Sequence, residues 1–246
     1  MMNILKSEFY KLKHTWIPWA HFILPVLYAL LFYGAATITG LKNFSDMDII
    51  QNYFVLLGAV LPIICGVITS KVVDMEASAG RFQVILSTTK SRSKAYGGKL
   101  IMLLLSFLFS ISLAVFIFAM LFGNQGTMAW LIELLLVFIG CLSTYMIHLW
   151  VSLMLGGGAS IGFGFVETLI ALLSITNLGE NIWYFLPCTW ASRLSATYIV
   201  GSELADSSYL IKEFTMWGYV AIPITVVIFT GSLLWFNRWG GKSISE

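Results

Sequence analysis

Glu167 is the residue whose type and position are least expected, because it lies about midway through the apolar run at 159–176. An acidic side chain at the centre of a membrane-spanning helix costs roughly 2.5 to 3.5 kcal/mol on insertion scales. Two interpretations have equal weight. Glu167 either contacts a cationic peptide or gates a wet cleft, or its protonated carboxyl group forms hydrogen bonds with neighbouring helices. The other residues on its helical face are small, which favours close helix packing: Ser160, Gly164, Ala171 and Ser174.

The remaining candidates for chemistry give little support for an enzyme. His21, Glu133 and His148 lie nearer the ends of apolar runs, where packing or interfacial roles are the more frequent ones. No HExxH motif, nucleophile elbow or spaced carboxylate pair is present. The ending GGKS at 240–243 resembles a phosphate-binding loop, but the first glycine of that motif would fall at Phe236. We therefore expect no catalytic, cofactor or metal site on this chain.

The composition indicates an integral membrane protein. Charged residues make up 11% of the 246 residues, whereas soluble proteins have about 25%, and the mean hydropathy is +0.87. Six apolar runs reach the roughly 20 residues that a membrane-spanning helix needs: 17–38, 51–70, 100–122, 131–153, 159–176 and 217–236. Backbone groups facing lipid must be satisfied internally, so we expect an all-α membrane protein with one domain, 1–246.

The basic residues predict the orientation. With six spans both termini lie on one side, and eleven of the fourteen Lys and Arg residues then fall on that side, in 1–16, 71–99 and 237–246. The other side keeps Lys42, Arg193 and Lys212. By the positive-inside rule, both termini are predicted to be cytoplasmic. We expect a multi-pass protein of the bacterial plasma membrane with no nucleic-acid partner.

The first 16 residues have the pattern of an amphipathic helix. Apolar residues recur at helical spacing on one face: Leu5, Phe9, Leu12 and Trp16. Charged residues occupy other faces: Lys6, Glu8, Lys11 and Lys13. A helix lying in the membrane interface fits this pattern, and Pro18 would then turn the chain into the bilayer. The alternative is that these residues only begin the first span and supply its positive flank.

The stretch at 72–99 is longer and more apolar than a loop that only joins two spans. Its apolar residues fall on one helical stripe: Val72, Met75, Ala79, Phe82 and Leu86. The pattern predicts a cytoplasmic amphipathic helix of about four turns, followed by a basic segment rich in Ser and Thr. Either the headgroups of the inner leaflet or another protein would cover the stripe.

The connection at 177–216 is the largest segment on the other side, and it mixes aromatic with acidic residues. Trp183 and Trp190 are ordinarily interpreted as part of an aromatic belt at the membrane surface. About 40 residues are more than a belt requires, so a second hypothesis places short amphipathic helices on the outer leaflet. There the aromatic residues, together with Glu203, Asp206 and Glu213, would contact an amphipathic cationic peptide.

The stretch at 72–99 also carries a family resemblance. Glu76 and Gly80 within an amphipathic segment, followed by a basic stretch ending at Lys99, resemble the cytoplasmic loop of ABC-2-type transporter permeases. The six spans and the cytoplasmic termini are similar to that family over the whole chain. The resemblance implies that 75–87 contacts an ABC ATP-binding subunit, present in two copies, through six residues: Met75, Glu76, Ala79, Gly80, Phe82 and Leu86. ATP and Mg would then be bound and used on that subunit.

Two further stretches resemble the permeases of lantibiotic self-protection (immunity) ABC transporters: GGGASIGFGF at 156–165 and NLGENIWYFLPCTWASRL at 177–194. That resemblance implies a second, sister permease and a lantibiotic that the complex expels from the membrane. An ABC-2 permease for another hydrophobic drug or a lipid-linked glycan is the alternative within transport. A membrane anchor or sensor partner without transport is the alternative outside it.

Overall fold

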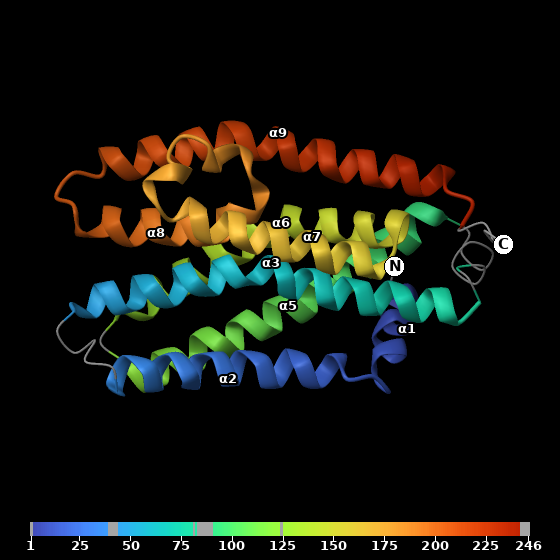
Figure 1. The fold of residues 1–246 in the computed structure, drawn as a ribbon, viewed down its shortest axis with the longest axis horizontal. Helices are drawn as coiled ribbons and strands as arrows, with labels where there is room; N and C mark the ends of the chain where they lie inside the picture. The colour runs from blue at the N-terminus through green and yellow to red at the C-terminus, as the bar shows by residue number, and fades with distance from the viewer. Residues whose placement is uncertain (1, 39–43, 81, 83–90, 124, 242–246) are drawn as a thin grey trace.

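The computed structural model describes residues 2–38, 44–80, 82, 91–123 and 125–241, which form a bundle of long helices (Figure 1). The described residues contain helices and turns but no β-strand. Among the described residues, six helices are long and apolar enough to cross a membrane, which confirms the predicted all-α fold. They are α2 (Ile17–Ile38), α3 (Asp46–Ser78), α5 (Arg92–Phe122), α6 (Thr127–Leu155), α7 (Gly157–Ser174) and α9 (Ser208–Arg238).

The helices differ in how much of their surface the chain itself covers. Helix α3 lies between the others, whereas α2 and α9 run along opposite edges of the bundle (Figure 1). In their most apolar windows, 72% of α3 is buried but only 22% of α2 and 17% of α9. The outer faces of α2 and α9 are therefore left for lipid or for another membrane protein to cover, which explains their many exposed Leu, Ile and Val side chains.

The helix ends are divided between the two ends of the bundle in the way that six membrane spans require. The N-terminal helix, the end of α3, the start of α5 and the end of α9 lie at one end, which we call the terminal end (Figure 1). The end of α2, the start of α3, the end of α5, the start of α6 and the turn between α8 (Trp190–Glu203) and α9 lie at the opposite end, which we call the far end (Figure 1). Helix α1 and the end of α9 thus lie at the same end of the bundle, and the cytoplasmic assignment of that end stays a prediction.

The N-terminal residues form helix α1 (Met2–Leu12), as the amphipathic pattern predicts. Ile4 contacts Gly98 of α5 so closely that a Cβ at Gly98 would lie 2.6 Å from its Cγ2 atom. The backbone N–H of Ile17 donates to the Thr15 hydroxyl at 3.2 Å where α2 begins, and Pro18 occupies the first turn, where a missing N–H costs nothing. Helix α1 therefore packs on α5, and its depth in the membrane stays a prediction.

The predicted amphipathic helix at 72–87 is not a separate element as far as the structure describes it. Helix α3 continues without a break to Ser78 and is about 50 Å long, well beyond the roughly 30 Å hydrocarbon core. A turn follows at Ala79 and Gly80. The pattern was correct for helix as far as Ser78 but wrong about the start of the helix, because a span and an amphipathic helix in phase with each other join smoothly. It was also wrong about Ala79 and Phe82, which lie in turns. Leu86 lies outside the described residues.

The segment after α7 folds back into the bundle. Three short 3₁₀ helices, η2 (Asn177–Gly179), η3 (Trp183–Phe185) and η4 (Pro187–Thr189), lead into α8. The start of α8 lies between two glycines: a Cβ on Gly58 of α3 would be 2.4 Å from the Ser192 nitrogen, and one on Gly140 of α6 would be 2.6 Å from Ala191 Cα. The hypothesis of helices lying on the outer leaflet is therefore wrong for the start of α8, because it is packed between two spans.

Candidate functional site

Four charged side chains, three of them buried, form a network at the terminal end. Lys99 Nζ lies 2.5 Å from Glu8 Oε2 and 3.0 Å from Glu76 Oε1. Lys11 Nζ lies 2.6 Å from the same Glu76 oxygen and 2.7 Å from Glu8 Oε1. Lys99, Glu8 and Glu76 are 2%, 5% and 6% exposed. We call these four residues the charge network; it ties α1 to the end of α3 and the start of α5.

The charge network is balanced, with two acids and two bases. Burial lowers the pKa of Lys11, but hydrogen bonds to Glu76 and Glu8 outweigh that effect, so the pKa of Lys11 is raised above its ordinary value. Lys11 therefore keeps its charge to alkaline pH, and its contribution to stability disappears only as the pH rises through that raised pKa. Removing one member would leave an uncompensated buried charge, which is strongly destabilising.

The residues predicted to contact an ATP-binding subunit do not share one surface. Ala79 and Gly80 are exposed at the turn after α3, and Met75 is half-buried against the core. Glu76 belongs to the charge network, and Phe82 is 2% exposed. Of the six residues predicted to contact the ATP-binding subunit, Ala79 and Gly80 are thus the ones that offer a free surface within the described residues.

Phe82 fixes the connection after α3 to the end of α9. Its ring centroid lies 4.9 Å from that of Trp239, and its φ of 68° is unusual for a residue other than glycine. Arg92, at the start of α5, donates to the backbone carbonyls of Asn237 at 3.1 Å and Trp239 at 2.8 Å. Four helices thus meet at the terminal end: α1, α3, α5 and α9.

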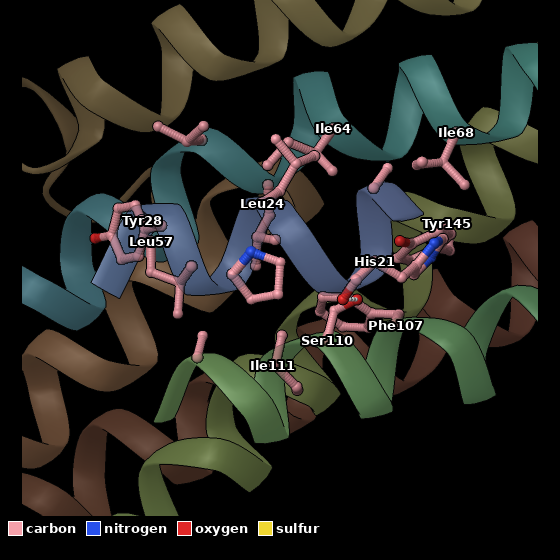
Figure 2. A pocket seen from close by; sticks show the side chains of 15 residues that line it. His21, Leu24, Tyr28, Leu57, Ile64, Ile68, Phe107, Ser110, Ile111 and Tyr145 are labelled. Carbon is pink, nitrogen blue, oxygen red and sulfur yellow. Dashed lines mark hydrogen bonds between the residues drawn. The ribbon is translucent and has the colours of Figure 1, made fainter. Parts of the chain in front are cut away.

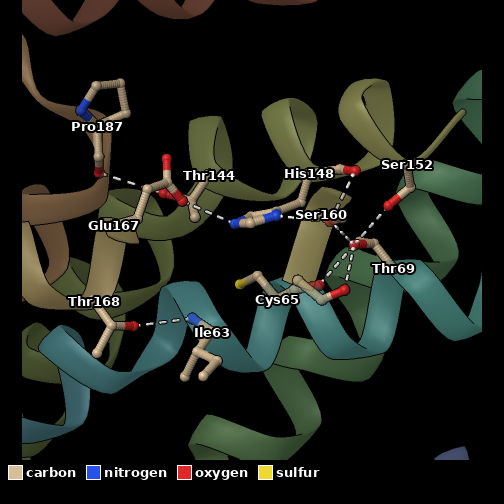
Figure 3. Close-up of polar contacts among 11 residues, drawn as sticks. Ile63, Cys65, Thr69, Thr144, His148, Ser152, Ser160, Glu167, Thr168 and Pro187 are labelled. Atoms are coloured by element: carbon tan, nitrogen blue, oxygen red, sulfur yellow. Dashed lines mark hydrogen bonds and ion pairs between the residues drawn. The ribbon is translucent and has the colours of Figure 1, made fainter. Parts of the chain in front are cut away.

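Glu167 lies in the middle part of α7 and is hydrogen-bonded to His148 of α6 (Figure 3). Its Oε2 atom is 2.8 Å from His148 Nε2, and His148 Nδ1 is 2.9 Å from the Ser160 hydroxyl. Ser160 lies 3.2 Å from the Thr69 hydroxyl, which also accepts from Ser152 at 3.4 Å. Glu167 is only 4% exposed, so the hydrogen-bonded interpretation describes this structure and a peptide-contacting role stays a hypothesis. We call these five residues the central polar cluster.

Helices α3 and α7 approach closely beside the central polar cluster. A Cβ on Gly164 would lie 2.7 Å from the Pro62 carbonyl oxygen. Pro62 cannot continue the hydrogen-bond pattern of α3, and the N–H of Ile63 donates to the Thr168 hydroxyl of α7 at 3.2 Å. The small stripe predicted on α7 is buried at all four positions: Ser160, Gly164, Ala171 and Ser174.

Three of the aromatic residues at 183–190 are buried, namely Trp183, Tyr184 and Trp190, whereas Phe185 is exposed. Trp183 and Trp190 are 2% and 1% exposed, and Trp190 Nε1 donates to the Tyr184 carbonyl at 3.0 Å. The Thr189 hydroxyl donates to the Trp183 carbonyl at 3.0 Å. The belt and peptide-contact predictions are therefore both wrong for the two tryptophans, because neither indole ring is free to contact lipid headgroups or a peptide in this structure.

The three acidic residues predicted in this segment have different surroundings. Glu203 and Asp206 are exposed at the far end. Two hydrogen bonds from Ser208 lower the pKa of Asp206, so this carboxylate keeps its charge at neutral pH. Glu213 is half-buried and accepts a hydrogen bond of 2.5 Å from the Tyr184 hydroxyl. Two of the three carboxylates thus face outward without holding the fold together.

No three His, Cys, Asp or Glu side chains within the described residues are placed to hold a metal ion. A protein-family model described as "ABC-2 family transporter protein" matches residues 4–170, which include most of α1, the charge network and the central polar cluster. No curated protein matches the chain significantly, and no solved structure does.

Proposed function

Because the chain belongs to the ABC-2 transporter family, we propose that it is the membrane-spanning subunit of an exporter that removes a lantibiotic from the membrane of the producing cell. The family implies an ABC ATP-binding subunit as partner, and the six apolar helices fit a multi-pass plasma-membrane protein. ATP and Mg would act on that subunit. A sister permease completes the proposed complex.

The ATP-binding subunit would dock at the terminal end, with both termini in the cytoplasm. The described residues at this end are rich in bases: Lys6, Lys11, Lys13, Lys71, Arg92, Lys94, Lys99 and Arg238. The exposed turn at Ala79 and Gly80 supplies the docking surface. A displacement of this turn would pass through Glu76 and the charge network into α1 and α5, and through Phe82 into α9.

The lantibiotic would be released or received at the far end. The observation that carries this part is the charge there, where the acidic side chains include Asp46, Asp48, Glu180, Glu203, Asp206 and Glu213, whereas the described bases are Arg193 and Lys212. A surface with this excess of carboxylates attracts a cationic peptide over a distance set by the salt concentration. Glu203 and Asp206 are the exposed pair best placed for contact.

Protection of a lantibiotic-sensitive bacterial strain tests this function. The chain is expressed with its ATP-binding subunit and sister permease, and the minimum inhibitory concentration of the lantibiotic is measured. We expect the Glu203→Gln, Asp206→Asn pair to lose most of the protection, because it removes two charges from the exposed surface. The charge-preserving pair Glu203→Asp, Asp206→Glu is the matched control and should keep it. Full protection by the neutralised pair would contradict peptide contact at these residues.

An ATPase-deficient partner subunit distinguishes transport from the anchor alternative. If the chain is present in the membrane in normal amounts alongside this deficient subunit but protection disappears, transport is supported. Unchanged protection would contradict an ATP-driven exporter and favour an anchor or sensor.

A further inference from the structure

A cavity of about 70 Å³ lies between α2, α3 and α5, with Tyr145 of α6 at its back (Figure 2). Its walls come from the middle parts of these spans, at 20–28, 57–68 and 107–114. At that depth a membrane-spanning helix is surrounded by hydrocarbon rather than by headgroups. The interior residues Phe107, Ile111 and Ala114 are at most 2% exposed, so lipid around the protein cannot reach them without entering the cavity.

Small residues and a proline create the space. Ala20 of α2 and Ala114 of α5 line the cavity where larger side chains would fill it. Pro25 has no N–H to donate to the carbonyl of His21, and the Ser110 hydroxyl donates to that carbonyl at 3.0 Å instead. Ser110 of α5 thus supports the interrupted turn of α2, and its small side chain does not fill the gap.

Three polar groups in the cavity wall already form hydrogen bonds within the protein. The Tyr28 hydroxyl donates to the Tyr53 carbonyl at 2.6 Å, and His21 Nδ1 is bonded to the Ile17 carbonyl at 2.9 Å. The Ser110 hydroxyl donates its hydrogen bond to the carbonyl of His21. A polar ligand would lose its hydrogen bonds to water and gain few in return, so the cavity selects an apolar guest.

The cavity borders a groove on the lipid-facing surface. A groove of about 130 Å³ between α2 and α3 shares Leu24, Ile64 and Ile68 with the cavity wall. Leu24 is 42% exposed and lies at the mouth, while Trp16 lies at the end of the groove nearer the N-terminus. A flexible chain lying in the groove would therefore reach the interior by passing Leu24.

We propose that the groove and the cavity hold one alkyl chain of a phospholipid from the leaflet on the N-terminal side. Trp16 is 44% exposed at the start of α2, where an indole ring suits the headgroup level. The exposed Lys13 lies three residues earlier and favours an anionic headgroup. The cavity has about half the volume of a 150 Å³ apolar cavity that binds benzene, so the end of an alkyl chain fits better than a ring.

The bound lipid chain would act as a wedge between α2 and α3. Within the described residues, the aromatic contact of Tyr28 with Tyr53, at 5.0 Å between ring centroids, joins these two helices on one side of the cavity. Occupancy would keep the two helices apart elsewhere. This inference does not depend on what the transporter exports.

Photolabelling of the full chain tests the proposal. The purified protein is placed in nanodiscs of phosphatidylcholine and phosphatidylglycerol containing a phosphatidylglycerol with a diazirine near the end of one acyl chain. After irradiation, mass spectrometry locates the adducts. We expect adducts on Phe107 and Ile111, in addition to lipid-facing residues such as Ile139. Adducts confined to lipid-facing residues would overturn the proposal.

Variants at the mouth provide the controls. Ile64→Trp should reduce the labelling of Phe107 and Ile111 at least fivefold and leave labelling of the lipid face unchanged. Ile139→Trp makes the same change on the lipid-facing side of α6 and should have no effect on interior labelling. If Ile64→Trp does not fold, Leu24→Trp blocks the mouth from its exposed side. Interior labelling that survives in a folded mouth variant, or that an added lantibiotic displaces, would contradict a lipid site.

Discussion

The two ends of the bundle are held together by different forces. At the terminal end, the charge network and Arg92 join four helices through ion pairs and hydrogen bonds. In the half of the bundle nearer the far end, the start of α8 is packed between Gly58 and Gly140 with no room for one extra carbon atom, and the buried Trp183 and Trp190 fill the adjoining space. The central polar cluster lies between the ends and relies on hydrogen bonds.

The contrast bears on how such a protein moves. Close-packed backbones transmit displacement as rigid bodies and resist any change of volume. Charged side chains on long stems can keep their partners while the helices that carry them shift. We infer that motion from the ATP-binding subunit enters at the terminal end, where charged side chains join the helices. The start of α8 would then move with α3 and α6 as one unit.

Lys99→Met should have the largest effect on stability, because it leaves Glu8 and Glu76 with only Lys11 to balance two buried carboxylates. Breaking a buried ion pair in this way costs about 3 to 5 kcal/mol. Denaturant unfolding in detergent measures the change in the free energy of unfolding. Lys94→Met, at an exposed position one turn earlier, is the control and should change it by less than about 0.5 kcal/mol. Equal effects of the two variants would show that the terminal end does not depend on the charge network.

Gly140→Ala tests the packing of the start of α8 against α6. The added Cβ would lie 2.6 Å from the Ala191 backbone, and overpacking of this kind costs about 1 to 3 kcal/mol. Gly34→Ala in α2 is the matched control, because nothing lies within 4 Å of its Cβ and alanine favours helix. The thermal midpoint should fall for Gly140→Ala and stay or rise for Gly34→Ala. The same midpoint for both variants would contradict the close approach of α8.

Substitutions at Glu167 test the region between the two ends. Glu167→Ala removes the partner of His148 Nε2, and leaving a buried polar group unsatisfied costs about 1 to 3 kcal/mol. Glu167→Gln keeps a hydrogen-bonding group there and should have a much smaller effect on stability. Protection against the lantibiotic is then measured for the Gln variant. Unchanged protection with normal expression would exclude a role for the Glu167 charge in transport.

Tyr184→Phe should give the smallest effect, visible mainly at alkaline pH. Burial, and then the hydrogen bond to Glu213, raises the pKa of Tyr184 to about 12. Between pH 10 and 12 the unfolded chain therefore releases this proton while the folded chain keeps it, and stability falls as the pH rises. The decline of the thermal midpoint over this range should be shallower in Tyr184→Phe than in the wild type. The exposed Tyr219→Phe is the control; an equal change there would contradict the assignment to Tyr184.

Much of the bundle could be predicted because hydrophobic length is a strong signal. The six spans and the buried small face of α7 follow from run length and helical spacing alone. The start of α8 could not be predicted, because it is packed on Gly58 and Gly140, which are far from it in the sequence. Periodicity within one segment contains no information about such a contact.

The polar sites were only partly predictable for a similar reason. Glu167 could be singled out as a buried acid, whereas His148 was interpreted as a packing residue. A signal for the pair did exist: the two residues lie at similar distances from the turn at Gly156, so antiparallel helices bring them to similar depth. Glu8 was placed on a polar face of the N-terminal helix, because its partner Lys99 is 91 residues away.

Copurification of the ATP-binding subunit tests the central claim most directly, which is that this subunit docks on the turn at Ala79 and Gly80. Ala79→Arg introduces a bulky charge at this exposed turn, and Leu204→Arg introduces the same side chain at an exposed position of the far end. We predict that Ala79→Arg loses at least nine-tenths of the bound subunit while Leu204→Arg keeps it, with both variants folded. Retention by Ala79→Arg together with loss by Leu204→Arg would contradict the account and place the ATP-binding subunit at the opposite end.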